Sequence, residues 1–254
     1  MSITSYPELV SISSSGNTVE FAATKTDAFN RLRVSSPLTL FDSSHRFADN
    51  DLWVEDTTGT ASSTFVIAQG LIDMDVGTAS GDEIIRETTK VFAYQPGKSL
   101  LVLNTFVFDE AKTNLRQRVG YYGASNGMYL EQTDTTVNFV ERSLVTGSVT
   151  ETRVAQADWN TDRMDGTGPS GITLDLSKAQ ILWMDIEWLG LGTVRLGFVI
   201  DGVFINCHSF HHANLVTSTY ITTASLPLRY EITNTGTVAS VSKLKQICSS
   251  VLSE

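Results

Sequence analysis

Two carboxylates spaced two residues apart are the first candidates for chemistry in this sequence. Asp185 and Glu187 alternate with large apolar residues between Ile181 and Trp188, the period-two pattern of a strand with two different faces. Side chains at positions i and i+2 of a strand share one face, so both carboxylates should point the same way. Such a pair could act as acid and nucleophile in glycoside hydrolysis. The alternative is a polar strand face whose acids meet solvent or Arg195 on the next strand.

The string from Met184 to Gly190, MDIEWLG, resembles the active-site strand of laminarinase- and lichenase-type glycoside hydrolases, whose fold is a jelly roll. In that family the pattern is Glu-x-Asp-x-Glu, and the first Glu is the nucleophile. Asp185 and Glu187 match the second and third acids, but Trp183 stands at the position of the nucleophile. We therefore predict that the chain is not an enzyme and has no catalytic residues.

The same strand offers a second hypothesis, which is binding without catalysis. Trp183 and Trp188 flank the two acids, and aromatic rings exposed beside carboxylates could stack on sugars. The possible ligand face therefore consists of Trp183, Asp185, Glu187 and Trp188. On this interpretation the chain is a carbohydrate-binding module.

Potential metal ligands lie between Cys207 and His212, where the sequence reads CHSFHH. Thiolate and imidazole groups are the ligands that zinc prefers. If the strand continues through this segment, Cys207 and His208 point to opposite faces and cannot both reach one metal ion. We expect a polar loop after a strand here, and we predict neither a metal site nor a cofactor.

The segment from Asp158 to Gly166 begins like a calcium loop of the helix–loop–helix type. Its pattern fails at Arg163, where the loop needs glycine, and at Pro169, where it needs the final Glu. A looser calcium site that includes Asp165 is one reading. The other is an acidic surface loop whose Asp and Asn side chains bond to the local backbone.

The elements that must position these residues centre on the stretch from Gln180 to His208. Asp201-Gly202 separates two apolar runs, and this pair is a strong hairpin signal because both positions tolerate positive φ. We predict three consecutive antiparallel strands. Their dense apolar face should comprise Trp183, Ile186, Trp188, Leu196, Phe198, Ile200 and Phe204.

The rest of the chain predicts an all-β fold. Many short apolar runs alternate with turn signals, and no stretch of a dozen residues keeps a 3.6-residue period. We predict a jelly-roll-like antiparallel β-sandwich over residues 60–254. Residues 1–59 should form an extended N-terminal arm and clamp, with one or two short strands in the Ser- and Thr-rich first 26 residues.

Composition restricts the classes of partner. The 254 residues carry a formal net charge of −10, which argues against a nucleic-acid partner because such binding needs a basic face. The two cysteines, Cys207 and Cys248, are too few for a disulfide framework. We find neither an apolar run long enough for a membrane span nor a signal-peptide pattern. We therefore expect no membrane partner, and we expect the chain to be made in a cytoplasm.

Several longer strings resemble a family of virion structural proteins of tailed bacteriophages, especially phages of marine bacteria and cyanobacteria. They occupy residues 27–47, 94–106, 118–132, 170–202 and 226–236. The resemblance implies a component of the virion, either a head decoration or cement protein or a tail-associated protein. Its partners would be major capsid or tail proteins, and a homo-oligomer such as a trimer is expected. The carbohydrate-binding alternative would then belong to a host-recognition appendage.

The N-terminal segment is the expected assembly element, because an extended arm can add contact area or join the sheet edge of a neighbouring subunit. The candidate contact residues are Phe29, Arg31, Leu32, Arg33 and Phe41.

Overall fold

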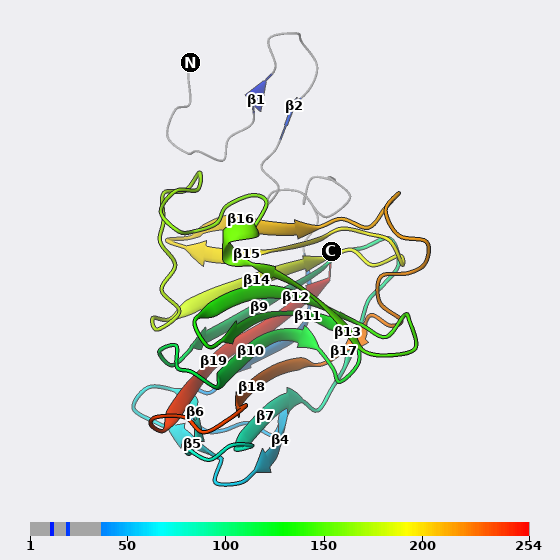
Figure 1. Cartoon of the computed structure of the whole chain (residues 1–254). Coiled ribbons are helices and arrows are strands. Elements are labelled where there is room, and N and C mark those ends of the chain that lie inside the picture. The colour runs from blue at the N-terminus through cyan, green and yellow to red at the C-terminus, as the bar shows by residue number, and fades with distance from the viewer. Residues whose placement is uncertain (1–10, 13–18, 21–36, 254) are drawn as a thin grey trace.

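Two antiparallel sheets pack face to face in the computed structural model of the chain (Figure 1). The structure describes residues 11–12, 19–20 and 37–253. Within these residues, every strand pairing is antiparallel, and the longest helical segment is the single 3-10 turn η2 (Gln156–Asp158). The predicted jelly-roll-like β-sandwich is therefore confirmed.

The first sheet contains seven strands in the order β13-β12-β11-β10-β18-β7-β4. Strands β10 to β13 follow one another as a meander, whereas β18 and β7 join it from distant parts of the sequence. The strand bounds are β4 (Trp53–Thr58), β7 (Glu83–Thr88), β10 (Leu115–Tyr122), β11 (Gly127–Thr133), β12 (Thr136–Ser143), β13 (Thr150–Ala155) and β18 (Leu228–Asn234).

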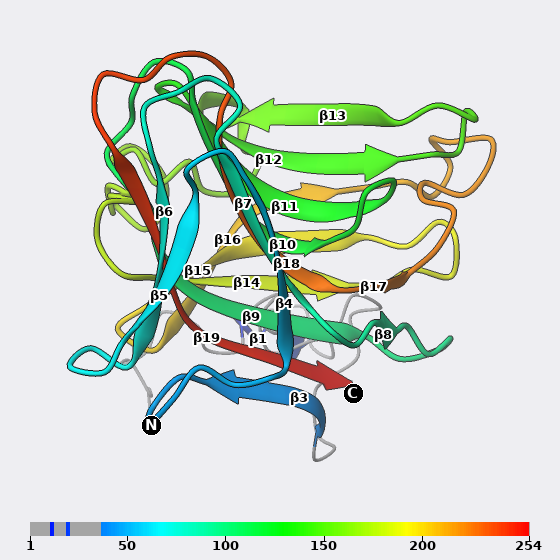
Figure 2. The same ribbon diagram turned by 90° about the horizontal axis from the view of Figure 1, so that it is seen from below.

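The second sheet contains eight strands, in the order β16-β15-β14-β9-β19-β6-β5 with β3 paired to the second half of β19. Figure 2 shows β3 beside the C-terminal half of β19, at the border of this sheet. The bounds are β3 (Leu38–Ser44), β5 (Ser62–Val66), β6 (Leu71–Val76), β9 (Leu100–Val107), β14 (Gln180–Ile186), β15 (Val194–Ile200), β16 (Val203–Phe210) and β19 (Ser242–Ser253).

Two further pairs are short. Strands β8 (Phe92–Ala93) and β17 (Ser225–Leu226) form one, and β1 (Ser11–Ile12) and β2 (Val19–Glu20) form the other. The pair β1-β2 agrees with the short strands expected in the first 26 residues.

The core lies between the two sheets because alternate residues of each strand point inward. Strand β9 shows this period clearly, with Leu100, Val102 and Phe106 buried and their neighbours half-buried. Aromatic rings fill the space between the sheets; Phe139 stacks on Trp159 with ring centroids 4.4 Å apart, and Phe198 packs against both.

The predicted meander is confirmed. Strands β14, β15 and β16 pair consecutively, and Asp201 and Gly202 turn with φ values of 51° and 80°. The predicted apolar face needs correction, because Trp183 and Phe204 lie outside the inter-sheet core and contact each other at 5.8 Å. Alternation along β14 sends Leu182, Met184 and Ile186 inward and leaves Trp183 on the outer face with Asp185.

The sandwich starts earlier than the predicted residue 60. Strand β3 pairs with β19, and β4 pairs with β7, so Leu38–Ser44 and Trp53–Thr58 belong to the two sheets. The sequence signal was ambiguous because Pro37 favours a bend, while the apolar residues after it suit an edge strand.

Candidate functional site

The predicted ligand face on β14 is more buried than expected. The side chains of Trp183 and Asp185 are 2% and 1% exposed, and Asp185 forms an ion pair with Arg195 on β15. The pairing with Arg195 agrees with one of the two readings of this strand, while the expectation of a wet face is corrected. The ring of Trp183 lies over Gly197, whose missing side chain leaves the space, and its Nε1 donates to the carbonyl of Ile205 at 3.1 Å.

The other two residues of this face are also engaged within the fold. Glu187 is buried and accepts a hydrogen bond from the backbone N–H of Thr193 at 3.2 Å. Trp188 is half-buried, packs edge-on against Tyr94 and donates from Nε1 to the carbonyl of Ile221. The buried ring of Trp183 cannot stack on a sugar, and the half-buried ring of Trp188 is held against Tyr94, so neither tryptophan provides the exposed platform that we expected.

The predicted assembly residues divide into two groups. Phe29, Arg31, Leu32 and Arg33 lie outside the described residues. Phe41 belongs to the core, where it is 8% exposed and its ring contacts Trp53 and Phe92. Phe41 is therefore a packing residue, because inward alternation on β3 places it between the sheets.

The histidine segment has separate partners for each ring. His208 accepts a hydrogen bond from the backbone N–H of Asn160 at 3.3 Å, and burial together with the neighbouring His211 lowers its pKa to about 4. His212 lies between the carbonyl oxygen of Gly192 and a carboxylate oxygen of Glu141. No group of three metal-binding side chains occurs among residues 37–253.

The acidic segment folds as the second reading proposed. Asp162 is buried and accepts hydrogen bonds from the backbone N–H groups of Met164 and Ser170 at 2.8 and 2.7 Å. Asp165 bonds in the same way to Thr167. These carboxylates hold the loop in shape and agree with an acidic surface loop.

The outer face of the seven-stranded sheet carries a network that sequence reasoning missed. Arg118 on β10 stands opposite Glu131 on β11 and Glu231 on β18, and it bonds to them at 2.7 and 3.1 Å. Glu131 also accepts from Arg153 at 2.7 Å. We call the whole set the arginine–glutamate network; its members are Arg116, Arg118, Arg142, Arg153, Arg229, Glu83, Glu87, Glu131, Glu151 and Glu231.

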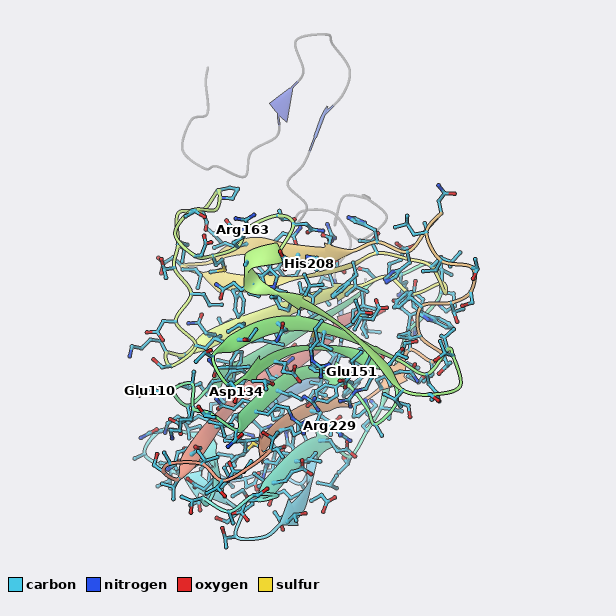
Figure 3. The ribbon with its side chains drawn as sticks, viewed as in Figure 1. Glu110, Asp134, Glu151, Arg163, His208 and Arg229 are labelled. Atoms are coloured by element: carbon cyan, nitrogen blue, oxygen red, sulfur yellow. The ribbon has the colours of Figure 1, made fainter. Side chains whose placement is uncertain are left out.

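Two tyrosines lie inside this network. Tyr122 and Tyr129 are fully buried, their ring centroids are 4.4 Å apart, and the guanidinium of Arg142 lies over both rings. Two network members, Glu151 and Arg229, are labelled in Figure 3 on β13 and β18. Five arginines balance five glutamates, so the network is close to neutral and bonded within itself.

The charges of the network keep its acids ionised. Burial alone would raise the pKa of Glu131, but hydrogen bonds and charge from Arg153 and Arg118 outweigh burial and lower it. Glu151 shows the same balance, and its hydrogen bonds from Tyr129 and Arg142 bring its pKa to about 2. A general acid in glycoside hydrolysis needs a raised pKa, so neither carboxylate suits that role.

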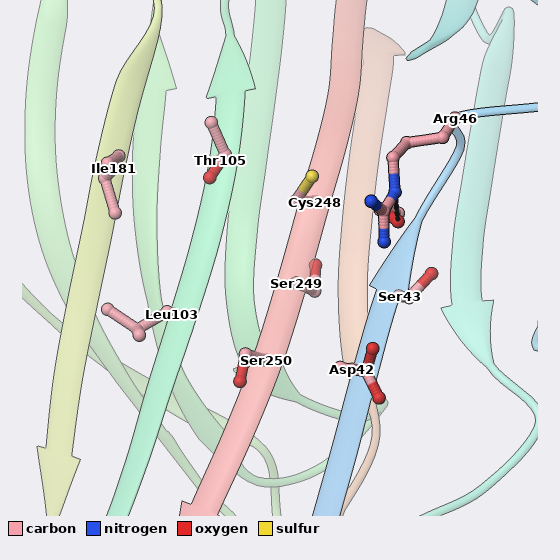
Figure 4. Close-up of a pocket in the computed structure, with 10 residues that line it drawn as sticks. Asp42, Ser43, Arg46, Leu103, Thr105, Ile181, Cys248, Ser249 and Ser250 are labelled. Atoms are coloured by element: carbon pink, nitrogen blue, oxygen red, sulfur yellow. Dashed lines mark hydrogen bonds between the residues drawn. The ribbon is translucent and has the colours of Figure 1, made fainter. Parts of the chain in front are cut away.

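An open groove crosses the outer face of the eight-stranded sheet (Figure 4). It has a volume of about 500 Å³, and it lies next to Trp183, because Ile181 and Trp183 of β14 pair with Thr105 and Leu103 of β9. We call it the outer groove. Its lining residues are Asp42, Ser43, Ser44, Arg46, Leu103, Thr105, Ile181, Cys248, Ser249 and Ser250.

The chemistry of the outer groove is mixed. Leu103 and Ile181 form an apolar part of its floor, while Ser44, Thr105 and Ser250 carry hydroxyl groups on half-buried side chains. Asp42 and Arg46 add one charge of each sign on the β3 side, as Figure 4 shows.

Burial raises the pKa of the Cys248 thiol in this groove, and the nearby charge of Arg46 acts in the opposite direction. A raised pKa makes a thiol a weaker nucleophile at neutral pH.

Comparison with known proteins supports the fold and leaves the function open. No protein-family model matches the chain, and no curated protein matches its sequence. A protein of unknown function, SO2946 from Shewanella oneidensis MR-1, is similar in structure, with a TM-score of 0.52 and 13% identity over 87% of this chain and 90% of that one. This likeness shows a shared fold.

Two other solved structures are similar at lower scores. The carbohydrate recognition domain of Emp47p has a TM-score of 0.47 and 10% identity over 81% of this chain and 90% of that one. The binding domain of botulinum neurotoxin serotype D/C has a TM-score of 0.45 and 8% identity, over 84% of this chain but only 48% of that one.

Among the residues that the structure describes, no helical segment has the length and apolar character that a membrane span requires.

Proposed function

We propose that this chain is a carbohydrate-binding module without catalytic activity, and that the outer groove holds the sugar. The observation that carries the proposal is the mixed lining of the groove. A sugar ring presents apolar C–H groups and several hydroxyls at once. The groove offers Leu103 and Ile181 to the first, and Ser44, Thr105, Ser250 and the charged pair at its rim to the second. Small-ligand pockets combine apolar surface with a few placed polar groups, and the volume of the groove, about 500 Å³, lies in their usual range.

The absence of catalysis is supported by how the acids are engaged. Asp185 is paired with Arg195, and Glu131 is held ionised by two arginines. Hydrolysis needs one carboxylic acid kept protonated beside a second carboxylate, and neither of these acids is placed in that way. The Emp47p domain named above is a carbohydrate recognition domain, which agrees with the proposal without carrying it.

A glycan array with the purified chain, followed by calorimetric titration of the best-bound oligosaccharide, tests this proposal. Ser250→Trp should fill the groove and weaken binding at least tenfold. The matched control is Ser62→Trp, an exposed serine on β5 of the same sheet and outside the groove, which should leave the affinity unchanged. Equal affinity of both variants, or a wild-type chain that binds no oligosaccharide on the array, would rule the groove out.

We keep as a second proposal that the chain is a structural component of a tailed-phage virion, present as a head decoration or as a tail-associated part. One support is the resemblance of the sequence to virion structural proteins of tailed phages. The other is the arginine–glutamate network, whose ion pairs cross-link the strands of one sheet face, as suits a module repeated many times in a particle. Its partners would be capsid or tail proteins. Mass spectrometry of purified particles, with antibody labelling in electron micrographs, tests it; particles that lack the chain would contradict it.

A further inference from the structure

Four loops at one end of the sandwich carry no formal charge, and the neighbouring loop from β8 to β9 carries one, Lys98. Residues 123–126, 144–149, 188–193 and 211–224 contain no Asp, Glu, Lys or Arg, although the chain has 46 such residues, 28 acidic and 18 basic. Figure 2 shows the loops that follow β12, β14 and β16 at the same end. We call these four segments the loop end.

The loop end exposes aliphatic side chains. Five of them are between 41% and 72% exposed to solvent: Val149, Leu189, Leu191, Leu215 and Val216. Scattered exposed leucines are ordinary, but a cluster of exposed apolar residues on one surface marks an interaction site.

Hydrogen bonds tie these loops to one another. The imidazole of His212 reaches the carbonyl of Gly192 at 2.5 Å and the carboxylate of Glu141 at 2.6 Å, and it stacks on Tyr220 at 3.9 Å. The backbone N–H of Tyr220 donates in turn to the carbonyl of Gly190 at 3.0 Å. The two loops that carry four of the exposed side chains are therefore held together.

A second set of hydrogen bonds joins the remaining loops. The buried side chain of Asn126 accepts from the backbone N–H groups of Leu144 and Thr222 and donates to the hydroxyl of Thr222 at 2.8 Å. Binding surfaces that are ordered in advance lose less conformational entropy on association. The loop end has this property.

A tight turn between β14 and β15 presents Leu189 to solvent. Leu189 and Gly190 have φ values of 37° and 81°, and the backbone N–H of Leu191 donates to the carbonyl of Trp188 at 2.9 Å. The side chain of Leu189 at the tip of this turn is half exposed.

We propose that the loop end is the surface through which two copies of this chain associate. The charge distribution selects this occupant. The opposite end carries acidic loops, with Glu110 and Asp134 labelled at the left of Figure 3, and the chain as a whole has a formal charge of −10. Two copies of an acidic chain repel each other, but the four segments of the loop end bring no like charges of their own into contact. A basic partner would find no acidic residue in the four segments, and Glu141 beside them is 13% exposed and already bonded to His212.

Symmetry supports the same occupant. A twofold arrangement brings one patch against its own copy, so a neutral aliphatic surface is complementary to itself. It also places the two acidic ends as far apart as possible. This inference concerns a different surface from the outer groove and rests on neither proposal above.

Sedimentation velocity of the full chain over a range of concentrations tests the inference. The wild-type chain should form a dimer, and Leu215→Asp should raise the dissociation constant at least tenfold. The matched control is Ile67→Asp, which places the same charge at a position that is 75% exposed between β5 and β6. The control should associate like the wild type.

Salt and cross-linking give independent readouts. Because dimerisation brings two acidic chains together, added salt should strengthen it by screening their repulsion, whereas an ionic interface would weaken. Leu215→Cys should form an intermolecular disulfide under mild oxidation. A wild-type chain that stays monomeric at all concentrations overturns the inference, as does equal loss of dimer in Ile67→Asp. Binding of the monomer to neutral vesicles through Leu215 would also overturn it, since the occupant would then be a lipid surface.

Discussion

Replacing Glu131 with glutamine tests whether the arginine–glutamate network stabilises the sandwich. Glu131 is 1% exposed and accepts hydrogen bonds from Arg118 and Arg153, both at 2.7 Å. Removing one partner of a buried pair costs about 3–5 kcal/mol, because the remaining charge stays buried. Arg118 keeps Glu231 at 3.1 Å, and Arg153 can turn to solvent, so we expect the lower end of that range, about 3 kcal/mol.

The comparison is Glu87→Gln in the same network. Glu87 is one-third exposed and pairs with Arg229 at 2.6 Å. Exposed pairs contribute about 0–1 kcal/mol, so this variant should differ little from the wild type. Urea unfolding of both variants in one buffer gives the two free energies of unfolding. In thermal unfolding, the loss of about 3 kcal/mol corresponds to roughly 6–12 °C for a chain of this size.

A double variant completes the test. Replacing Arg118 and Glu131 together with methionine removes both charges and keeps apolar volume, which is often close to neutral in free energy. The double variant should therefore be more stable than Glu131→Gln. The free energies of unfolding of Glu131→Gln and Glu87→Gln should differ by more than about 0.5 kcal/mol, the usual error of additivity. A smaller difference would show that the network does not stabilise the fold, and our reasoning about it would fail.

Three further predictions concern other parts of the sandwich. Phe198→Ala removes a fully buried ring and should lower the free energy of unfolding by about 3–5 kcal/mol in denaturant titrations, without loss of the all-β circular dichroism spectrum. His208 has a folded pKa of about 4 against an ordinary 6.5, so the unfolded chain binds the extra proton and stability should fall as the pH drops from 6.5 toward 4; His208→Gln should flatten that part of the pH profile, and an unchanged profile would contradict the assignment. Gly197→Ala should destabilise strongly, because its new methyl would lie 1.8 Å from the carbonyl oxygen of Ile205; a variant that melts like the wild type would show that the strand can shift.

Local patterns in the sequence were sufficient for the fold class and the central meander. The alternation around Asp185 and the Asp201-Gly202 turn depend on a few neighbouring residues, and pleat and turn geometry act over that range. The same local reasoning identified the acidic loop, because Asp162 and Asp165 accept hydrogen bonds from backbone N–H groups no more than eight residues further along the chain.

Only the tertiary structure decided what surrounds each side chain. Arg118 meets Glu231 from a strand more than a hundred residues later, and no local pattern predicts which strands become neighbours. The burial of Trp183 depends on Gly197 opposite it, and Phe41 became a core residue only when β3 paired with β19. The outer groove and the loop end likewise arise from segments far apart in the chain. Side-chain alternation is a local property, whereas strand register and the closure of a sandwich are set by contacts between distant residues.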